Sequence, residues 1–245
     1  TTVGAVTVRA GSINLDDHSL TDGTEVGTKS NSGAVAGVVD VEAAGPVAVR
    51  NGARIGSDNF FSGRAGDVRV KGTTITVGGQ FSELASTAFG TGSAGVVRVE
   101  ASERIDVVAS ALVASEVYGN GTSSRVEIRA PVLEVRGSGN SRDITTVSTG
   151  RDGVIDIEVG RVLVSAGAHV RALTNNGNAG AIEIRAESVY VDGQGVLTSI
   201  GTEAERGSAG ILRILARDEV VIRNGGALTA WGGGRTARPG AIEIA

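Results

Sequence analysis

The sequence predicts an all-β fold, a single right-handed parallel β-helix with about eight coils of roughly 29 residues and three strands per coil. Three observations predict it. A seven-residue segment recurs at nearly constant spacing, apolar and polar residues alternate with a period of two, and the composition combines 38 glycines with only seven aromatic residues. We expect residues 1–245 to form one solenoid without an internal domain boundary.

The repeated segment is clearest as GVVRVEA at residues 95–101. Close copies lie at 37–43, 66–72 and 180–186, and looser copies begin at positions 4, 124, 153, 210 and 240. The interval from one copy to the next is therefore nearly constant along the whole chain. Because its scatter is narrow, each unit is predicted to be one structural turn.

The first strand of each unit coincides with this anchor segment. Apolar residues occupy every second position, as in Val68 and Val70 or Val97 and Val99, which places them on one face of a strand. A second alternating strand follows nine or ten residues after each anchor start, as in Ile75 and Val77 or Val162 and Val164. Both strands are therefore expected to line a common aliphatic core.

A corner of small residues follows the second strand, for example Asn51-Gly52-Ala53 and Asn224-Gly225-Gly226. Asn and Gly tolerate the left-handed backbone region that tight turns need. A third, weaker strand comes next, as at residues 168–172, and a polar loop such as residues 174–179 closes the unit. No helical stripe is present, which argues against ankyrin and tetratricopeptide repeats, and a propeller blade would need a fourth strand. Parallel stacking of the coils at about 4.8 Å gives a rod of roughly 40 Å.

The outward positions provide an independent test of the register. The sixth residue of successive anchors alternates in charge without a break over seven coils. Opposite charges stacked across neighbouring strands stabilise the pairing, whereas like charges oppose it. We therefore predict a structural charge ladder formed by Arg9, Glu42, Lys71, Glu100, Arg129, Glu158 and Arg185.

Composition excludes several classes of function. The net charge of −4 does not indicate the basic surface that is typical of nucleic-acid-binding proteins. No apolar run approaches the ~20 residues that a membrane helix needs. The absence of cysteine removes disulfides and thiolate chemistry. The first residues are not a signal peptide and the chain lacks Met, so we expect it to come from a longer precursor. Exposed edge strands at both ends predict continuation in a longer chain or end-to-end self-association.

Motifs that could carry chemistry have simpler explanations. Residues 90–95 match G-x-G-x-x-G, but a strand follows instead of the helix of a dinucleotide fold. Asp16, Asp17 and His18 could suggest an acidic site, yet the next coil supplies Arg50 and Asn51 there, so no carboxylate cluster builds up. His169 is expected to point outward. We therefore predict no catalytic, cofactor-binding or metal-binding residues.

The aromatic residues leave two interpretations open. Phe60, Phe89 and Tyr118 follow one another at the same interval as the anchors at 37, 66 and 95, and Trp231 lies near the same phase of the last full coil. We favour a stack that fills a corner inside the helix. The alternative is an exposed stripe at the loop edge that contacts a glycan or a protein partner, and Phe61 beside Phe60 supports some exposure because adjacent strand residues face opposite sides.

The repeat resembles the filamentous haemagglutinin-like repeats of bacterial two-partner secretion exoproteins. The segments that carry this resemblance are SAGAHVRA at 165–172, GNAGAIEI at 177–184 and GSAGILRI at 207–214. The family's amino-terminal secretion domain is not recognisable, so the chain resembles a piece of the fibre shaft. The resemblance implies export through an outer-membrane partner and display on the outer surface of a Gram-negative bacterium, with a role in adhesion to a glycan, a host cell or a neighbouring cell.

These observations favour a non-enzymatic structural segment of a secreted or cell-surface fibre, which spaces or presents an adhesin. Two alternatives stay open. The aromatic stripe predicts a glycan-binding module, and the fold by itself also allows a polysaccharide lyase or hydrolase, although this last alternative rests on fold analogy alone.

Overall fold

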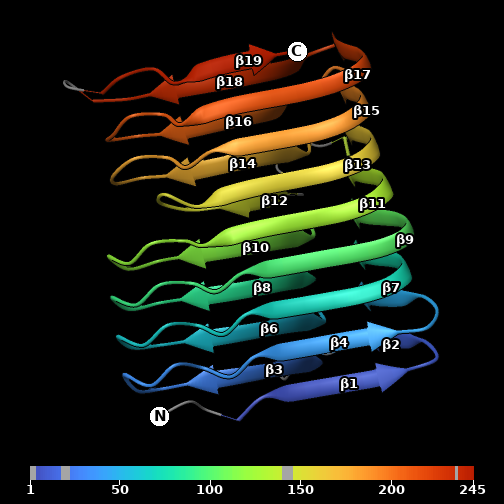
Figure 1. Cartoon of the computed structure of the whole chain (residues 1–245), viewed down its shortest axis with the longest axis vertical. Coiled ribbons are helices and arrows are strands. Elements are labelled where there is room, and N and C mark those ends of the chain that lie inside the picture. The colour runs from blue at the N-terminus through green and yellow to red at the C-terminus, as the bar shows by residue number, and fades with distance from the viewer. Residues whose placement is uncertain (1–3, 18–22, 140–145, 235–236) are drawn as a thin grey trace.

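The computed structural model describes residues 4–17, 23–139, 146–234 and 237–245, and only the backbone of residues 146–149. The described residues form a right-handed parallel β-solenoid. The strands of the larger sheet run to the right at the front of Figure 1 and those of the smaller sheet run to the left behind them, while the chain climbs from the N-terminus to the C-terminus. The predicted fold class is confirmed.

Two sheets make up the walls of the solenoid. The larger, 11-stranded sheet has the order β1-β4-β7-β9-β11-β13-β15-β17-β19, with β2 and β5 beside its first strands. It comprises β1 (Val6–Ala10), β2 (Ile13–Asp16), β4 (Val39–Ala43), β5 (Val47–Arg50), β7 (Val68–Gly78), β9 (Val97–Val108), β11 (Arg125–Arg136), β13 (Val154–Ser165), β15 (Ile182–Asp192), β17 (Ile211–Arg223) and β19 (Ala241–Ile244).

The 8-stranded sheet contains the third strand of each coil, in the order β18-β16-β14-β12-β10-β8-β6-β3. It comprises β3 (Glu25–Ser30), β6 (Arg54–Asn59), β8 (Glu83–Ala88), β10 (Leu112–Val117), β12 (Thr146–Thr149), β14 (His169–Thr174), β16 (Thr198–Ala204) and β18 (Gly226–Gly232). All strand pairs within both sheets are parallel, and each strand pairs with its copy in the next coil.

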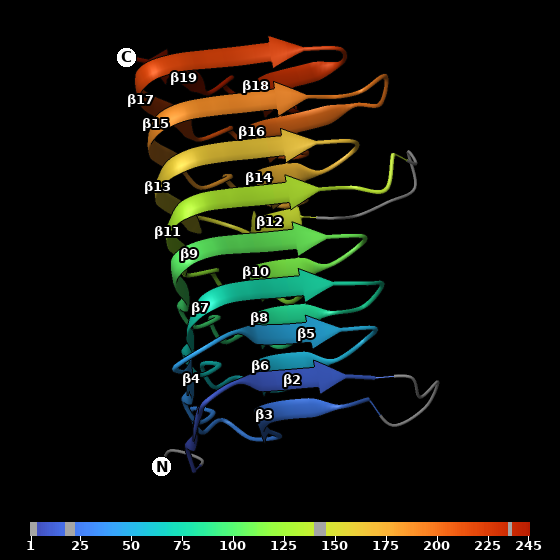
Figure 2. The ribbon, with the colours of Figure 1, turned by 90° about the vertical axis from the view of Figure 1, so that its right-hand side faces the viewer.

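The first two strands of a unit are separate only at the beginning of the chain. From β7 onward the anchor strand and the second strand join into one long strand that bends in the middle, which Figure 2 shows at the left of each coil. The register shifts at this bend, for example between Gly72 and Thr74. The bend therefore takes the place of a separate corner and keeps both halves in one hydrogen-bonded sheet.

The core consists of stacked aliphatic rows. Val97 and Val99 are fully buried, as are Ile105 and Val107 from the second half of the same strand and Val113 from the facing sheet. Period-two alternation places these side chains inside and leaves their neighbours at the surface. Each buried side chain contributes roughly 1.5–3 kcal/mol of transfer free energy, before the loss of conformational entropy is deducted.

A row of buried hydroxyl groups joins the two sheets across the interior. Ser57, Ser86 and Ser115 are fully buried and lie opposite one another in three successive coils. Ser86 Oγ donates a hydrogen bond to the carbonyl oxygen of Gly66 at 2.8 Å and accepts one from the amide of Gly95 at 2.8 Å. Ser57 and Ser115 make the same two kinds of contact one coil away on either side. The hydroxyls thereby satisfy backbone groups at the start of each anchor, which would otherwise be buried without partners.

Close approach between coils explains the glycine that opens several of the anchors. A methyl group added at Gly66 would overlap the carbonyl oxygen of Gly37, and one added at Gly95 would overlap that of Gly66. No side chain fits in so narrow a space. Other glycines serve the turns into the smaller sheet, where Asn51 and Gly52 both have positive φ, at 53° and 97°, as a type I′ turn requires.

Candidate functional site

The residues of the predicted charge ladder lie opposite one another in the larger sheet. The register pairs Arg9 with Glu42, Glu42 with Lys71, Lys71 with Glu100, Glu100 with Arg129, Arg129 with Glu158 and Glu158 with Arg185. Within this row, ion pairs form between Arg9 and Glu42 at 3.2 Å, Lys71 and Glu42 at 3.2 Å, and Arg129 and Glu158 at 3.3 Å.

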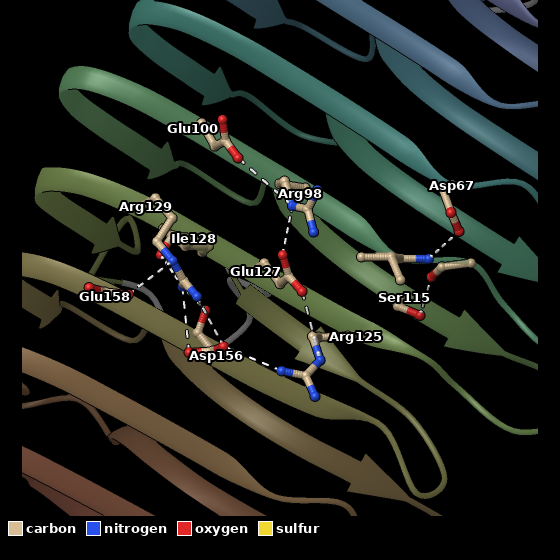
Figure 3. Close-up of polar contacts among 12 residues, drawn as sticks. Asp67, Arg98, Glu100, Ser115, Arg125, Glu127, Ile128, Arg129, Asp156 and Glu158 are labelled. Carbon is tan, nitrogen blue, oxygen red and sulfur yellow. Dashed lines mark hydrogen bonds and ion pairs between the residues drawn. The ribbon is translucent and has the colours of Figure 1, made fainter.

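Other charges of the ladder pair diagonally with the neighbouring outward row. Asp156 is the centre of this lattice, with its carboxylate 3.0 Å from Arg129 and 3.3 Å from Arg125 (Figure 3). It also lies 3.4 Å from Arg185. One coil earlier, Glu127 lies 2.6 Å from Arg98. The hydrogen bond from Arg98 to Glu127, which outweighs the opposing effect of burial, raises the pKa of Arg98. The charges form a two-row network instead of a single column.

A shallow groove of ≈ 610 Å³ follows the bend of the long strands beside this network. Glu42, Lys71, Glu100 and Arg129 line it together with small residues of the bend. These four side chains already take part in ion pairs with one another or with the neighbouring row. The charged side chains of the groove are therefore engaged in contacts that hold adjacent coils together.

A second charged cluster lies on the outer face of the smaller sheet. Arg54 contacts Glu25 at 2.7 Å, Asp58 at 2.5 Å and also Glu83, so one guanidinium meets three carboxylates from three coils. Burial raises the pKa of Glu83, and the charge and hydrogen bond of Arg54 oppose this change. Burial by itself would lower the pKa of Arg54. The hydrogen bond to Asp58 and the charges of Glu83, Asp58 and Glu25 outweigh burial and raise this pKa. The cluster ties β3, β6 and β8 together.

The aromatic residues form a stack that is exposed to solvent. The ring centroids of Phe60 and Phe89 are 4.8 Å apart with planes within 4°, and those of Phe89 and Tyr118 are 5.3 Å apart with planes within 10°. Their exposed fractions are 41%, 43% and 69%. The favoured interior position is therefore wrong. Each ring follows the last residue of a third strand, where alternation ends and the chain enters the polar loop.

Two other aromatic residues lie outside the stack. Phe61 is 62% exposed and sits in the loop beside Phe60. Trp231 pairs in register with Glu203, which in turn pairs with Leu173. Trp231 therefore lies within strand β18, whereas Tyr118 follows the last residue of strand β10. Trp231 is 55% exposed. All five residues of the predicted stripe are therefore exposed, but only Phe60, Phe89 and Tyr118 form one stack.

A hollow of ≈ 280 Å³ opens beside Tyr118, at the C-terminal end of the stack. Its walls include Glu116 and Asn120 from the coil of Tyr118, Arg151 from the next coil, and Arg171 from β14. The phenol of Tyr118 donates a hydrogen bond to Glu116 at 3.0 Å. The charge of Glu116, followed by burial and this hydrogen bond, raises the pKa of Tyr118 well above its usual value.

The arginines of the hollow are held in different ways. Arg151 donates to the carbonyl oxygen of Asn176 at 3.0 Å and to that of Asn120 at 3.2 Å, so it bridges two loops. The Nε atom of Arg171 is buried and has no hydrogen-bond partner among the residues that the structure describes. Two guanidinium groups therefore line the hollow.

The residues discussed as possible chemical motifs lie in strands and turns, and several make hydrogen bonds within the chain. Asn51 donates to Asp16 at 2.8 Å, and Asp17 accepts from the amide of Thr24 at 3.0 Å. His18 lies outside the described residues. His169 contacts the hydroxyl of Ser199 at 2.9 Å through Nδ1, and the strand β9 follows the glycine-rich loop 90–95. In the described part of the chain no group of three or more acidic, histidine or cysteine side chains is placed to hold a metal ion, and no helix is long and apolar enough to cross a membrane.

Sequence reasoning missed two features of this region. The inward serines carry a visible signal, since they recur at the coil interval in three successive third strands, but a polar residue in a weak strand is normally assigned to the surface. The hollow has no comparable signal, because its walls come from three coils.

No protein-family model, curated protein or solved structure matches the chain.

Proposed function

We propose that this chain is a non-enzymatic rod segment of a secreted or cell-surface fibre, which spaces or presents an adhesin on the outer surface of a Gram-negative bacterium. The observation that carries the proposal is the unbroken parallel pairing from β1 to β19. Every coil contacts its neighbours through backbone hydrogen bonds that run along the long axis, and such a solenoid resists extension and bending. The resemblance of segments 165–172, 177–184 and 207–214 to adhesin repeats supports the location.

Immunogold electron microscopy of the cells that produce the protein tests this proposal. An antibody against residues 95–129 is expected to label filaments on the intact cell surface. Label found only inside permeabilised cells would overturn the proposed location. The non-enzymatic part is tested by incubating the chain with acidic polysaccharides and recording the absorbance of unsaturated products, which is expected to stay at the level of the buffer.

Self-association along the axis belongs to the same proposal. The edge strand β19 is exposed throughout, with Ile242 at 42% and Ile244 at 52%. A strand edge with apolar side chains is a template for another strand, which a following coil of a longer chain or a second copy can supply. Sedimentation velocity at increasing concentration is expected to show species larger than a monomer, and Ile244→Lys is expected to reduce them. A monomer at all concentrations would contradict this part.

A second candidate function is glycan binding, favoured by the exposed stack of Phe60, Phe89 and Tyr118. Soluble proteins seldom leave three adjacent aromatic rings in water without a partner, and sugar rings pack well against aromatic surfaces. A glycan array probed with the whole chain tests this function. Binding to defined glycans is expected, and the absence of binding to any glycan would leave the rod function alone.

A further inference from the structure

We propose that the hollow beside Tyr118 binds one neutral pyranose ring, which stacks on the free face of the Tyr118 phenol ring. The inference rests on the glycan-binding function proposed above and assigns it to one place. It names the ligand chemistry, the ring that recognises it and the polar groups that orient it.

The geometry of the stack leaves one aromatic face available on the side of the hollow. The three rings are nearly parallel and follow one another at the spacing of the coils, so both faces of Phe89 are covered by its neighbours. Phe89 therefore offers mainly its ring edge to solvent. On the other side of Tyr118 the next coil brings Gly150 and Arg151, and no ring in the described part of the chain stacks there. The higher exposure of Tyr118, 69% against 43% for Phe89, agrees with one open face.

The size of the hollow suits a single ring. Its volume of ≈ 280 Å³ lies just below the range of about 300–1,000 Å³ that is usual for small-molecule sites. A longer oligosaccharide can enter with one residue only, while its remaining residues stay in solvent. The site is therefore expected to recognise the end of a glycan chain or a branch.

The polar groups match the hydroxyl groups of a sugar. The guanidinium groups of Arg171 and Arg151 line the hollow, and Arg151 is held in place by two loop carbonyls. Asn175 and Asn176 also line the hollow, and an amide side chain can donate and accept at once. A few fixed polar groups beside an apolar face are typical of sites that orient a small ligand.

The walls of the hollow carry both signs of charge. Glu116 accepts a hydrogen bond from the phenol of Tyr118, while Arg151 and Arg171 bring two guanidinium groups to the same hollow. A neutral sugar, whose hydroxyl groups both donate and accept hydrogen bonds, can meet both kinds of group without a charge of its own.

Saturation-transfer NMR and titration with methyl glycosides of glucose, galactose and mannose, and with methyl glucuronide, test the site in the whole chain. Tyr118→Ala is expected to weaken binding of the neutral sugar about tenfold, because it removes the stacking face. Tyr118→Phe keeps the face and is expected to retain affinity within about threefold. Phe60→Ala, at the far end of the stack, is the matched control and should leave affinity unchanged, whereas Arg171→Ala should weaken it. Melting curves of all four variants report whether they fold.

The outcomes separate the inference from the function on which it rests. If array glycans bind and neither Tyr118→Ala nor Arg171→Ala weakens their binding, the hollow is not the binding site and the glycans bind elsewhere on the rod. Equal losses in Phe60→Ala and Tyr118→Ala would assign binding to the edge of the whole stack and overturn the hollow. Preference for the glucuronide would overturn the neutral ligand. Absence of binding to every glycan would end both the site and the glycan-binding function.

Discussion

The hydroxyl oxygen of Ser86 accepts a hydrogen bond from the amide of Gly95 at 2.8 Å across the interior of the solenoid. The same oxygen donates to the carbonyl of Gly66 one coil earlier. A single buried hydroxyl thus connects the smaller sheet to two consecutive anchors of the larger sheet. The repetition of this contact at Ser57 and Ser115 makes it a regular part of the coil.

Ser86→Ala is expected to lower the free energy of unfolding by about 1–3 kcal/mol, because an amide and a carbonyl lose their partner in a buried site. Chemical denaturation followed by circular dichroism measures the change. Ser86→Thr is the matched variant, since Thr28 fills the equivalent position and donates to Gly37 at 2.7 Å. Ser102→Ala, at an exposed position of β9, should stay within about 0.5 kcal/mol of the parent. Equal stability of Ser86→Ala and Ser102→Ala would contradict the structural role.

Gly66→Ala is expected to destabilise the solenoid by about 3 kcal/mol or more, because its methyl group would overlap the carbonyl of Gly37 and force two coils apart. Gly11→Ala is the control, since a methyl group there meets nothing within 4 Å. Thermal melting of the two variants should differ clearly. A Gly66→Ala protein as stable as the Gly11→Ala protein would show that the coils tolerate wider spacing.

Asp156→Asn should lower the free energy of unfolding by about 1–2 kcal/mol, since hydrogen bonds to charged groups are the strong ones and this carboxylate faces three arginines. Glu158→Gln, at a side chain that is 60% exposed, should have a much smaller effect. Denaturation in low and high salt measures both. The gap between Asp156→Asn and the parent should narrow in high salt because screening weakens these partly exposed pairs. Equal effects of the two substitutions would contradict the central place of Asp156.

Tyr118 should ionise at higher pH than an ordinary tyrosine. Deprotonation would place a phenolate beside the carboxylate of Glu116 and remove the donated hydrogen bond, so the neutral phenol is favoured. An ultraviolet titration in a Tyr190→Phe background isolates this group, because the chain has only two tyrosines. Glu116→Gln is expected to bring the pKa of Tyr118 down toward its usual value. A titration that Glu116→Gln leaves unchanged would count against the contact.

Ala109→Asn is expected to stabilise the protein by about 1 kcal/mol, because a methyl side chain is unfavourable in the left-handed backbone region, which Asn enters more readily. Ala109 and Ser110 both have positive φ, at 55° and 68°, in a turn where other coils place Asn51-Gly52 or Asn224-Gly225. The melting temperature measures the gain, with Ala111→Asn expected to destabilise instead because Ala111 is fully buried. A loss of stability in Ala109→Asn would show that another contact decides this turn.

Much of the architecture could be predicted because a parallel solenoid repeats its environment every coil. Val97 and Val99 recur as Val126 and Ile128, and one register then places every equivalent residue one above the other. The opposite charges of Glu100 and Arg129 could be placed opposite each other on the same grounds. The diagonal contacts of Asp156 could not, because two outward rows lie within reach of one another and side-chain length selects among several partners.

By itself, the sequence determined the solenoid, its coil length, its buried rows and the register between coils, since each follows from a period. The tertiary structure alone decided on which side of the wall the aromatic stack lies. Phe60, Phe89 and Tyr118 come just after their strands end, where alternation no longer distinguishes inside from outside, and their spacing of one repeat is the same in both cases. The hollow beside Tyr118 was likewise beyond reach, because no repeat describes a cavity whose walls come from three different coils.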